Sequence, residues 1–217
     1  MGTHKHSEDI IRACSVLHAK NMLAAGDGNL SVLLPDGNIL IPPAGRPKAF
    51  LEAHDMAILS PDGRAIKGKP SSESLMHLTV YATCPKAQAC VHAHPPHIIA
   101  WGIARPQDLE LPSRHMSELI LAVGGVPFVP YARPGTQNMG DVLVPFLEKG
   151  HRALALRHHG AISWGEDLEE AMNGMERMEH SALCLKIASE LGPISELPEE
   201  EILEFRRMFK DRGGRSL

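Results

Sequence analysis

The chain has 217 residues, with 22 Lys or Arg against 26 Asp or Glu and a formal net charge of −4. This length suits one domain over residues 1–217 with a substantial core, and the charge balance excludes a concentrated basic surface for nucleic acid. No apolar run approaches the ~20 residues of a membrane-spanning helix, and the first residues lack the apolar core of a signal peptide. We therefore expect a cytoplasmic protein.

The four cysteines are scattered along the chain and form no C-x-x-C pair. We interpret them as small buried hydrophobic residues in a reducing compartment, not as a disulfide or zinc framework. Aromatic residues make up only 4% of the chain, which argues against base-stacking platforms for nucleic acid.

In chain order, the first predicted element is an amphipathic helix over 7–24, with Ser7 as its N-cap. A hairpin follows, with strands over 29–34 and 38–41. Further strands are predicted at 56–60, 89–92, 126–130, 153–156 and 161–164. Further helices are predicted at 71–83, 95–104, 116–123, 137–149, 167–191 and 197–211. Because strands and helices alternate irregularly, with hairpins among them, we expect an α/β fold with a sheet of mixed direction covered by helices.

Two histidine clusters carry the strongest chemical signal. His92-Ala93-His94 ends an apolar strand, and side chains two apart on a strand point to one face, where both can bind one ion. A third imidazole from His158-His159 would complete a catalytic zinc site with an open position. Since neighbouring strand residues face opposite ways, we expect only one of His158 and His159 to be a ligand. His97 is predicted to be a rim or solvent residue. The alternative is that one histidine of the pair at 92–94 points into the core.

The segment Ser71-Ser72-Glu73 is predicted to open a helix. Two hydroxyls at a helix N-terminus can seat a phosphate or carboxylate, although the same pattern also serves as a plain N-cap. His77 follows one turn later, where it either supports Glu73 or meets a partner subunit. Upstream, Gly28-Asn29 offers a flexible loop and an amide, and Ala44-Gly45 offers a second backbone nest.

Taken in order, seven strings resemble motifs of the class II aldolase/adducin family, above all its fuculose-phosphate aldolase branch. They are Gly28–Ser31, Ile39–Gly45, Pro70–Glu73, Val91–His94, Pro130–Thr136, His158–Gly160 and Asp167–Ala171. The tail from Glu199 onward resembles that branch's final helix. The resemblance covers nearly the whole chain, and it implies a single-domain fold with a central mixed, mostly antiparallel sheet and helices on both faces.

The same resemblance implies a metal centre and a reaction. His92, His94 and His159 would bind Zn²⁺, or Mn²⁺ or Co²⁺ in its place. Glu73 would be both a fourth ligand that substrate displaces and the catalytic residue that moves the proton of an enediolate. The substrate phosphate would lie among Gly28, Asn29, Ala44, Gly45, Ser71 and Ser72. The implied activity is that of a zinc-dependent aldolase, which cleaves a small ketose phosphate such as L-fuculose 1-phosphate to dihydroxyacetone phosphate and an aldehyde.

A homotetramer with sites near its subunit interfaces is also implied by the resemblance. The long helix after Asp167 and the basic tail at 210–215 are candidates for that boundary. Their alternative interpretations are a solvated helix face and a frayed end.

Two departures from the family pattern concern the substrate and the acid. Pro42 and Ala44 stand where the family carries Thr or Ser, so hydroxyl donors are missing from the phosphate loop. Arg46, beside the gap, either supplies charge to the phosphate or is a solvated loop residue. Glu118 aligns near the position where fuculose-phosphate aldolases carry a tyrosine acid.

These departures leave other functions open. A relative on the same scaffold could decarboxylate a hydroxy or keto acid, or dehydrate a thiosugar phosphate, with the same histidines. A third alternative is a non-catalytic interaction module like the adducin head domain, which lacks the metal-binding histidines.

Overall fold

The computed structural model describes residues 2–216 and contains one sheet. Its strands are β1 (Asn29–Leu33), β2 (Ile39–Ile41), β3 (Ala57–Leu59), β4 (Ala65–Lys67), β5 (Ala89–Ala93), β6 (Phe128–Val129), β7 (Ala153–Leu156) and β8 (Gly160–Gly165). The eight strands lie in the order β4-β3-β2-β1-β5-β8-β7-β6, and only β6 and β7 are parallel to each other. The mixed, mostly antiparallel sheet expected from the sequence is confirmed.

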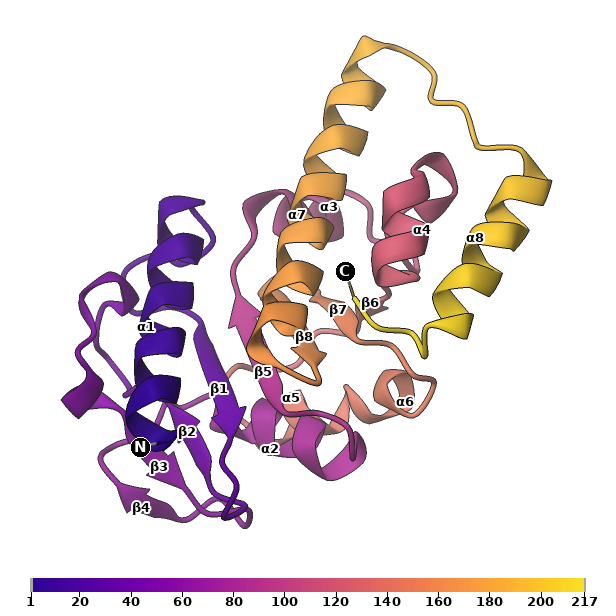
Figure 1. Cartoon of the computed structure of the whole chain (residues 1–217). Helices are drawn as coiled ribbons and strands as arrows, with labels where there is room; N and C mark the ends of the chain where they lie inside the picture. Colours follow the sequence, from indigo (N-terminus) through magenta and orange to yellow (C-terminus); the bar gives the residue numbers. More distant parts are fainter. Residues whose placement is uncertain (1, 217) are drawn as a thin grey trace.

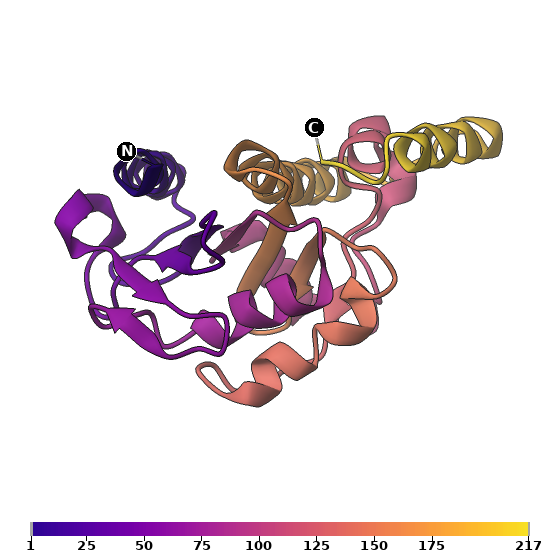
Figure 2. The ribbon, with the colours of Figure 1, turned by 60° about the horizontal axis from the view of Figure 1, so that its bottom comes forward.

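Helices cover both faces of this sheet (Figures 1 and 2). They are α1 (Gly2–Ala19), α2 (Ser74–Thr83), α3 (Pro96–Ala104), α4 (Ser117–Val123), α5 (Gln137–Asp141), α6 (Val144–Leu147), α7 (Leu168–Leu191) and α8 (Glu199–Asp211). Short 3₁₀ turns occur at Lys48–Phe50, Ala53–Asp55 and Ser113–His115. In Figure 2, α1, α4, α7 and α8 lie on one face, and α2, α5 and α6 lie on the other. None of the helices within residues 2–216 is both long and apolar enough to cross a membrane.

Each face has its own hydrophobic core, and the central strand β5 contributes to both. Val91 belongs to the core with Leu17 and Met178 beneath α1 and α7, whereas Cys90 belongs to the core with Val80 beneath α2. Side chains alternate along a strand, so a centrally placed strand that is buried on both faces reads as a continuous apolar run. Because β5 is buried on both faces, the strand that carries His92 could be predicted from the sequence.

The first helix differs from its prediction. It begins at Gly2, so Ser7 lies inside the helix, where its hydroxyl donates to the Thr3 carbonyl at 3.0 Å instead of capping the end. An ion pair between Lys5 and Asp9 at 2.9 Å supports this added turn, because residues four apart are neighbours on a helix. The helix also ends at Ala19, before the predicted position 24.

Three other elements also differ. The second helix begins at Ser74, so Ser71 and Ser72 precede it, and Glu73 occupies the N-cap without a side-chain cap bond. The helix predicted for 137–149 is two short helices, because Pro145 lacks the amide that a continuous helix needs. The edge strand β4 was not predicted, since none of its residues is buried.

The interpretation of the cysteines is confirmed for three of them, since Cys14, Cys84 and Cys90 are buried thiols. Burial raises the pKa of Cys14 to about 12 and that of Cys84 to about 11. The tail is not a frayed end, because the Ser216 amide donates to Glu170 at 3.0 Å at the start of α7.

Candidate metal centre

Four side chains from three parts of the fold meet at one end of β5. Glu73, His92, His94 and His159 each offer a ligand atom, and these atoms lie within 4.8 Å of one another. Glu73 caps α2, while His92 lies on β5 and His94 directly follows that strand. His159 lies in the turn between β7 and β8. The structure thus brings together the residues that the sequence analysis assigned to a metal.

Backbone geometry places these side chains. A Cβ on Gly160 would lie 2.4 Å from the Ala93 carbonyl oxygen, so only glycine allows the β7–β8 turn to approach β5 this closely. Before it, His158 adopts φ 58°, and its ring packs against Tyr131 with centroids 6.2 Å apart. This left-handed residue turns the chain so that His159, and not His158, joins the cluster.

The Nε2 atoms of the histidines and the carboxylate of Glu73 face one another. His159 Nε2 lies 3.0 Å from Glu73 Oε1, yet this buried oxygen has no hydrogen bond within residues 2–216. His92 Nε2 lies 3.2 Å from the other Glu73 oxygen and 3.3 Å from His94 Nε2. Buried polar atoms are nearly always hydrogen-bonded, so a convergent unpaired set calls for another partner. Three imidazoles and a carboxylate fit a divalent cation such as Zn²⁺.

Surrounding groups favour the forms that bind metal. The Ala161 carbonyl accepts from His92 Nδ1 at 2.9 Å, which leaves Nε2 with a lone pair aimed at the centre. Burial, followed by the neighbouring His92 and His159, lowers the pKa of His94 to about 3. Burial raises the pKa of Glu73, but the imidazoles of His159 and His92 outweigh it and hold that pKa below its ordinary value. At neutral pH the centre thus combines a neutral His94 with a carboxylate.

A pocket of about 450 Å³ opens beside the cluster. Of the predicted substrate residues, five line its wall: Gly28, Ala44, Gly45, Ser71 and Ser72. Asn29 does not line it, because its side chain is fully buried and donates through Nδ2 to Ser71 Oγ at 2.9 Å. The side chain of Asn29 therefore contacts a residue of the pocket wall, Ser71, and not the pocket itself.

Sequence reasoning missed two charged residues of this wall, Asp27 and Lys48. Asp27 Oδ2 lies 3.6 Å from His94 Nδ1, next to the Gly28-Asn29 segment that was singled out without it. Lys48 follows the Ala44-Gly45 loop, but a lone lysine in a loop is usually a solvated residue. The sequence offered no signal that this lysine is buried.

Two other charged candidates lie elsewhere. Arg46 pairs with Asp55 at 3.1 Å on an exposed loop, which agrees with its interpretation as a solvated residue. Glu118 accepts from the Ser117 hydroxyl at 2.8 Å at the start of α4 and does not line the pocket.

The two remaining histidines singled out in the sequence have protein partners. His97 is half-buried and lies 2.6 Å from Glu179, outside the cluster. His77 is completely buried, which excludes a contact with a partner subunit, and its Nδ1 lies 2.7 Å from the Ser31 hydroxyl.

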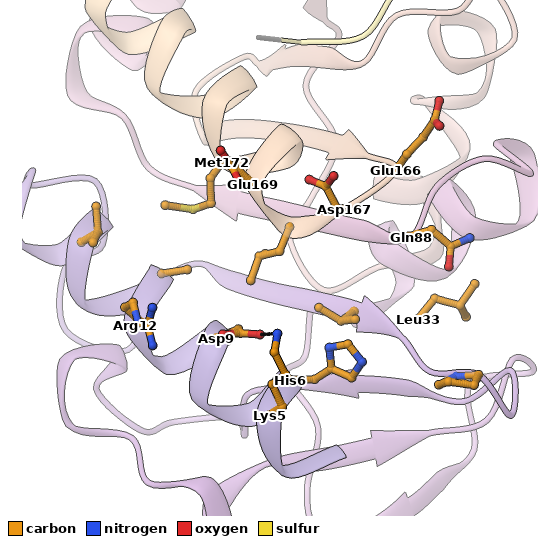
Figure 3. Close-up of a pocket in the computed structure, with 15 residues that line it drawn as sticks. Lys5, His6, Asp9, Arg12, Leu33, Gln88, Glu166, Asp167, Glu169 and Met172 are labelled. Atoms are coloured by element: carbon orange, nitrogen blue, oxygen red, sulfur yellow. Dashed lines mark hydrogen bonds and ion pairs between the residues drawn. The ribbon is translucent and has the colours of Figure 1, made fainter. Parts of the chain in front are cut away.

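A larger groove of about 970 Å³ lies on another side of the molecule, between α1, β1 and the start of α7 (Figure 3). Its charged side chains include Lys5, which pairs with Asp9, as the dashed line in Figure 3 marks. None of the four cluster residues lines this groove. The convergent polar atoms, and not the size of the hollow, identify the candidate site.

Comparison with known proteins identifies relatives over nearly the whole length. The sequence model of the class II aldolase and adducin N-terminal domain matches residues 8–185. The 3-oxo-tetronate 4-phosphate decarboxylase of Escherichia coli (strain K12) is 34% identical over 201 residues, covering 92% of this chain and 94% of that protein. The L-fuculose phosphate aldolase of the same strain is 32% identical over 217 residues, covering 98% of each chain.

Solved structures give the same result. YgbL from Escherichia coli, described as a candidate aldolase/epimerase/decarboxylase, superposes with a TM-score of 0.87 at 33% identity. That match covers 95% of this chain and 100% of the YgbL chain. An L-fuculose 1-phosphate aldolase superposes with a TM-score of 0.84 at 27% identity, covering 95% of this chain and 96% of that one.

Proposed function

This chain belongs to the class II aldolase and adducin family, and from that premise we propose that it is a metal-dependent lyase that decarboxylates a phosphorylated 3-oxo acid. The observation that carries the proposal is the convergence of Glu73, His92, His94 and His159, of which His92 is buried and the others half-buried, beside a polar pocket. The three histidines and Glu73 would hold one divalent cation, with Zn²⁺ as the first candidate and Mn²⁺ or Co²⁺ as alternatives.

Loss of carbon dioxide from a 2-hydroxy-3-oxo acid breaks the bond between the carboxylate and the adjacent carbon, and the electron pair passes into an enediolate, which then takes up one proton at that carbon. A bound divalent cation supplies Lewis acidity toward the 3-oxo group. The pocket wall at 28, 44–45 and 71–72 orients the phosphate. Glu73 is the carboxylate nearest the histidines, and we assign it the transfer of one proton, taken from water, to the carbon that has lost carbon dioxide.

The proton-transfer groups of the pocket differ from those that aldol cleavage is expected to need. Retro-aldol cleavage needs a group that accepts the proton of the aldehyde-side hydroxyl, the role for which the family resemblance implies a tyrosine, whereas decarboxylation needs no such group. Neither tyrosine of the chain, Tyr81 or Tyr131, lines the pocket, and Glu118 lies at the start of α4 outside it. The Tyr81 hydroxyl is bonded to Ser31 at 2.7 Å.

The second candidate is the aldolase reaction on a ketose phosphate such as L-fuculose 1-phosphate. It is favoured by the match to L-fuculose phosphate aldolase over 98% of both chains. In this case we propose that the chain is a homotetramer and that a partner subunit supplies the group that accepts the proton of the aldehyde-side hydroxyl. Light scattering that gives a monomer at assay concentration would exclude this arrangement.

One assay separates the two candidates. A four-carbon 2-hydroxy-3-oxo acid 4-phosphate and L-fuculose 1-phosphate are each incubated with the zinc-loaded protein, and dihydroxyacetone phosphate, carbon dioxide and aldehyde are measured. Both reactions yield dihydroxyacetone phosphate, so the other product decides between them. Carbon dioxide from the first substrate and no aldehyde from the second support the decarboxylase. Aldehyde without carbon dioxide supports the aldolase.

Metal analysis tests the third alternative, in which the chain is a non-catalytic interaction module. Purified protein that takes up about one zinc, manganese or cobalt ion per chain fits an enzyme of this family. No uptake of any of the three metals would contradict both catalytic candidates and favour an adducin-like interaction module.

A further inference from the structure

Lys48 is buried in a way that core packing does not explain. Its side chain is only 1% exposed, and Nζ donates to the carbonyl oxygens of Gly26 at 2.9 Å, Arg46 at 3.0 Å and Pro43 at 3.3 Å. These three bonds engage all three ammonium protons. No carboxylate within residues 2–216 forms an ion pair with Nζ, and burying a charge without a counter-ion is costly.

The carbonyls that Lys48 binds belong to the two loops that form one wall of the pocket. Residues 26–28 and 44–45 line it together with Lys48 itself. In the second loop, the Ala44 amide donates to the Lys69 carbonyl at 3.0 Å. The next amides, those of Gly45 and Arg46, have no acceptor within the described part of the chain. Gly45 adopts φ +72°, and a Cβ placed on it would meet no atom within 4 Å, so this turn faces open space.

The charge of Lys48 matters because the other charged side chains that line the pocket are carboxylates. Asp27 and Glu73 both line it, and Asp27, which is not one of the four cluster residues, would repel a phosphate dianion entering beside it. The loop also lacks hydroxyl donors at Pro42 and Ala44. Lys48 offers a fixed positive charge in the same wall. Burial lowers the pKa of Lys48, and the nearby Asp27 and Glu73 oppose that shift.

We propose that Lys48 is the positioning residue of a phosphate subsite: its buried ammonium holds the carbonyls of loops 26–28 and 43–46 inward, leaves the Gly45 and Arg46 amides available, and offsets the acidic wall. The inference rests on the proposed function in one respect, namely that the substrate carries a phosphate. It adds a residue that recognises phosphate through backbone amides and buried charge, in place of loop hydroxyls.

Inorganic phosphate is the probe, and its affinity for the zinc-loaded full chain is measured by titration calorimetry. K48M keeps the length of the side chain without its charge and donors, and we expect its phosphate affinity to fall by about tenfold to a hundredfold. K48R keeps the charge and should retain more affinity than K48M. K69M is the matched control, because Lys69 is an exposed lysine beside the same loop, and its affinity should equal that of the wild type.

Measuring the zinc content of each protein separates a failure of this inference from a failure of the proposed function. A variant K48M that retains zinc but loses phosphate affinity supports the role of Lys48, whereas unchanged phosphate affinity would overturn it. A general loss of both zinc and phosphate would also overturn it, because that result indicates a collapsed site. If the wild type binds phosphate but no zinc, the proposed function fails while the Lys48 comparison can still be made.

A measurement on the wild type covers the case in which K48M does not fold. Phosphate is titrated into ¹⁵N-labelled protein, and the amide resonances of Gly45 and Arg46 are followed. We expect these two to shift with one common dissociation constant, while the amide of exposed Lys67 does not shift. No shift of Gly45 and Arg46 at saturating phosphate would overturn the inference.

Discussion

The polar atoms of two clusters of charged side chains in the described part of the chain differ in how far they are hydrogen-bonded. In the first, Arg152 donates to Glu170 at 2.8 Å and to Glu166 at 3.1 Å, and its guanidinium lies 4.4 Å from the centre of the Trp164 ring. Both oxygens of Glu170 accept further bonds, from the Glu166 amide at 2.8 Å and the Ser216 amide at 3.0 Å. This cluster is complete as it stands.

The second cluster, Glu73 with His92, His94 and His159, is incomplete without a further partner. One Glu73 oxygen has no hydrogen bond among the described residues, although His159 Nε2 lies 3.0 Å from it, and the Nε2 atoms of His92 and His94 face each other at 3.3 Å. The difference shows how to separate a structural ion pair from a ligand set. A structural pair distributes its protons among acceptors, whereas a ligand set leaves lone pairs directed at one point.

The strongest test of this distinction exchanges neighbouring histidines. H159N removes a ligand, so we expect loss of bound zinc and a fall in turnover of about ten-thousandfold, since Lewis acidity supplies several kcal/mol. H158N is the matched control, because His158 is exposed and asparagine tolerates its left-handed backbone conformation. It should keep both metal and turnover. Equal losses in the two variants, measured by metal analysis and initial rates, would contradict the ligand assignment.

A substitution in the complete cluster around Arg152 should lower the free energy of unfolding and leave metal binding unchanged. E170A leaves the Arg152 charge buried without its main partner, and we expect unfolding to become easier by about 3–5 kcal/mol. E169A, at the exposed neighbouring position, should change stability by less than about 0.5 kcal/mol. Urea unfolding gives both values. If E170A keeps its fold but loses bound metal, the distinction between a structural ion pair and a metal-ligand set does not hold for these two clusters.

Removing the metal should affect the incomplete cluster alone. A ligand that binds only the folded state stabilises it by about 4 kcal/mol at a thousand times its dissociation constant, so chelation should lower the melting temperature of the wild type. The same chelator should not change the melting temperature of H159N, which has already lost the site. Calorimetric scans with and without chelator measure the difference. An equal shift in both proteins would mean that the metal stabilises some other region.

The sequence predicted the regular elements better than their ends. Buried strands such as β5 were found because both of their faces are apolar, and the mixed direction of the sheet followed from the irregular alternation of elements. The start of α1 was missed, because Ser7 offers the same hydroxyl inside a helix as at a cap. A sequence pattern cannot show which acceptor such a hydroxyl finds in the folded chain.

The candidate site shows the same limit. The spacing of His92 and His94, together with the family resemblance, predicted which residues form the cluster. Their distances and hydrogen bonds came only from the structure. The indirect role of Asn29 was not predictable, since its partner Ser71 lies 42 residues away. The same holds for Lys48, which binds a carbonyl 22 residues away. Contacts between distant loops depend on the assembled fold, and local sequence patterns do not record them.

The smallest expected effect concerns His77, which lies behind the incomplete cluster. It is completely buried, and its Nε2 has no hydrogen bond within residues 2–216. Burial, with His92 adding to it and Glu73 opposing it, lowers its pKa to about 3 from 6.5. The unfolded chain therefore binds a proton that the folded chain does not, so the stability present above pH 6.5 is lost as the pH falls toward 3.

H77Q isolates this contribution, because glutamine can still bond to Ser31 but does not titrate. For the metal-free wild type we expect His77 alone to remove about 2 kcal/mol of unfolding free energy between pH 7 and pH 5. His94 contributes a similar acid loss in both proteins, since its pKa is also lowered to about 3. Urea unfolding at pH 7, 6 and 5 should thus give H77Q the shallower pH dependence. Parallel curves would show that His77 takes up its proton without unfolding, and that the space behind the cluster tolerates charge even when the metal is absent.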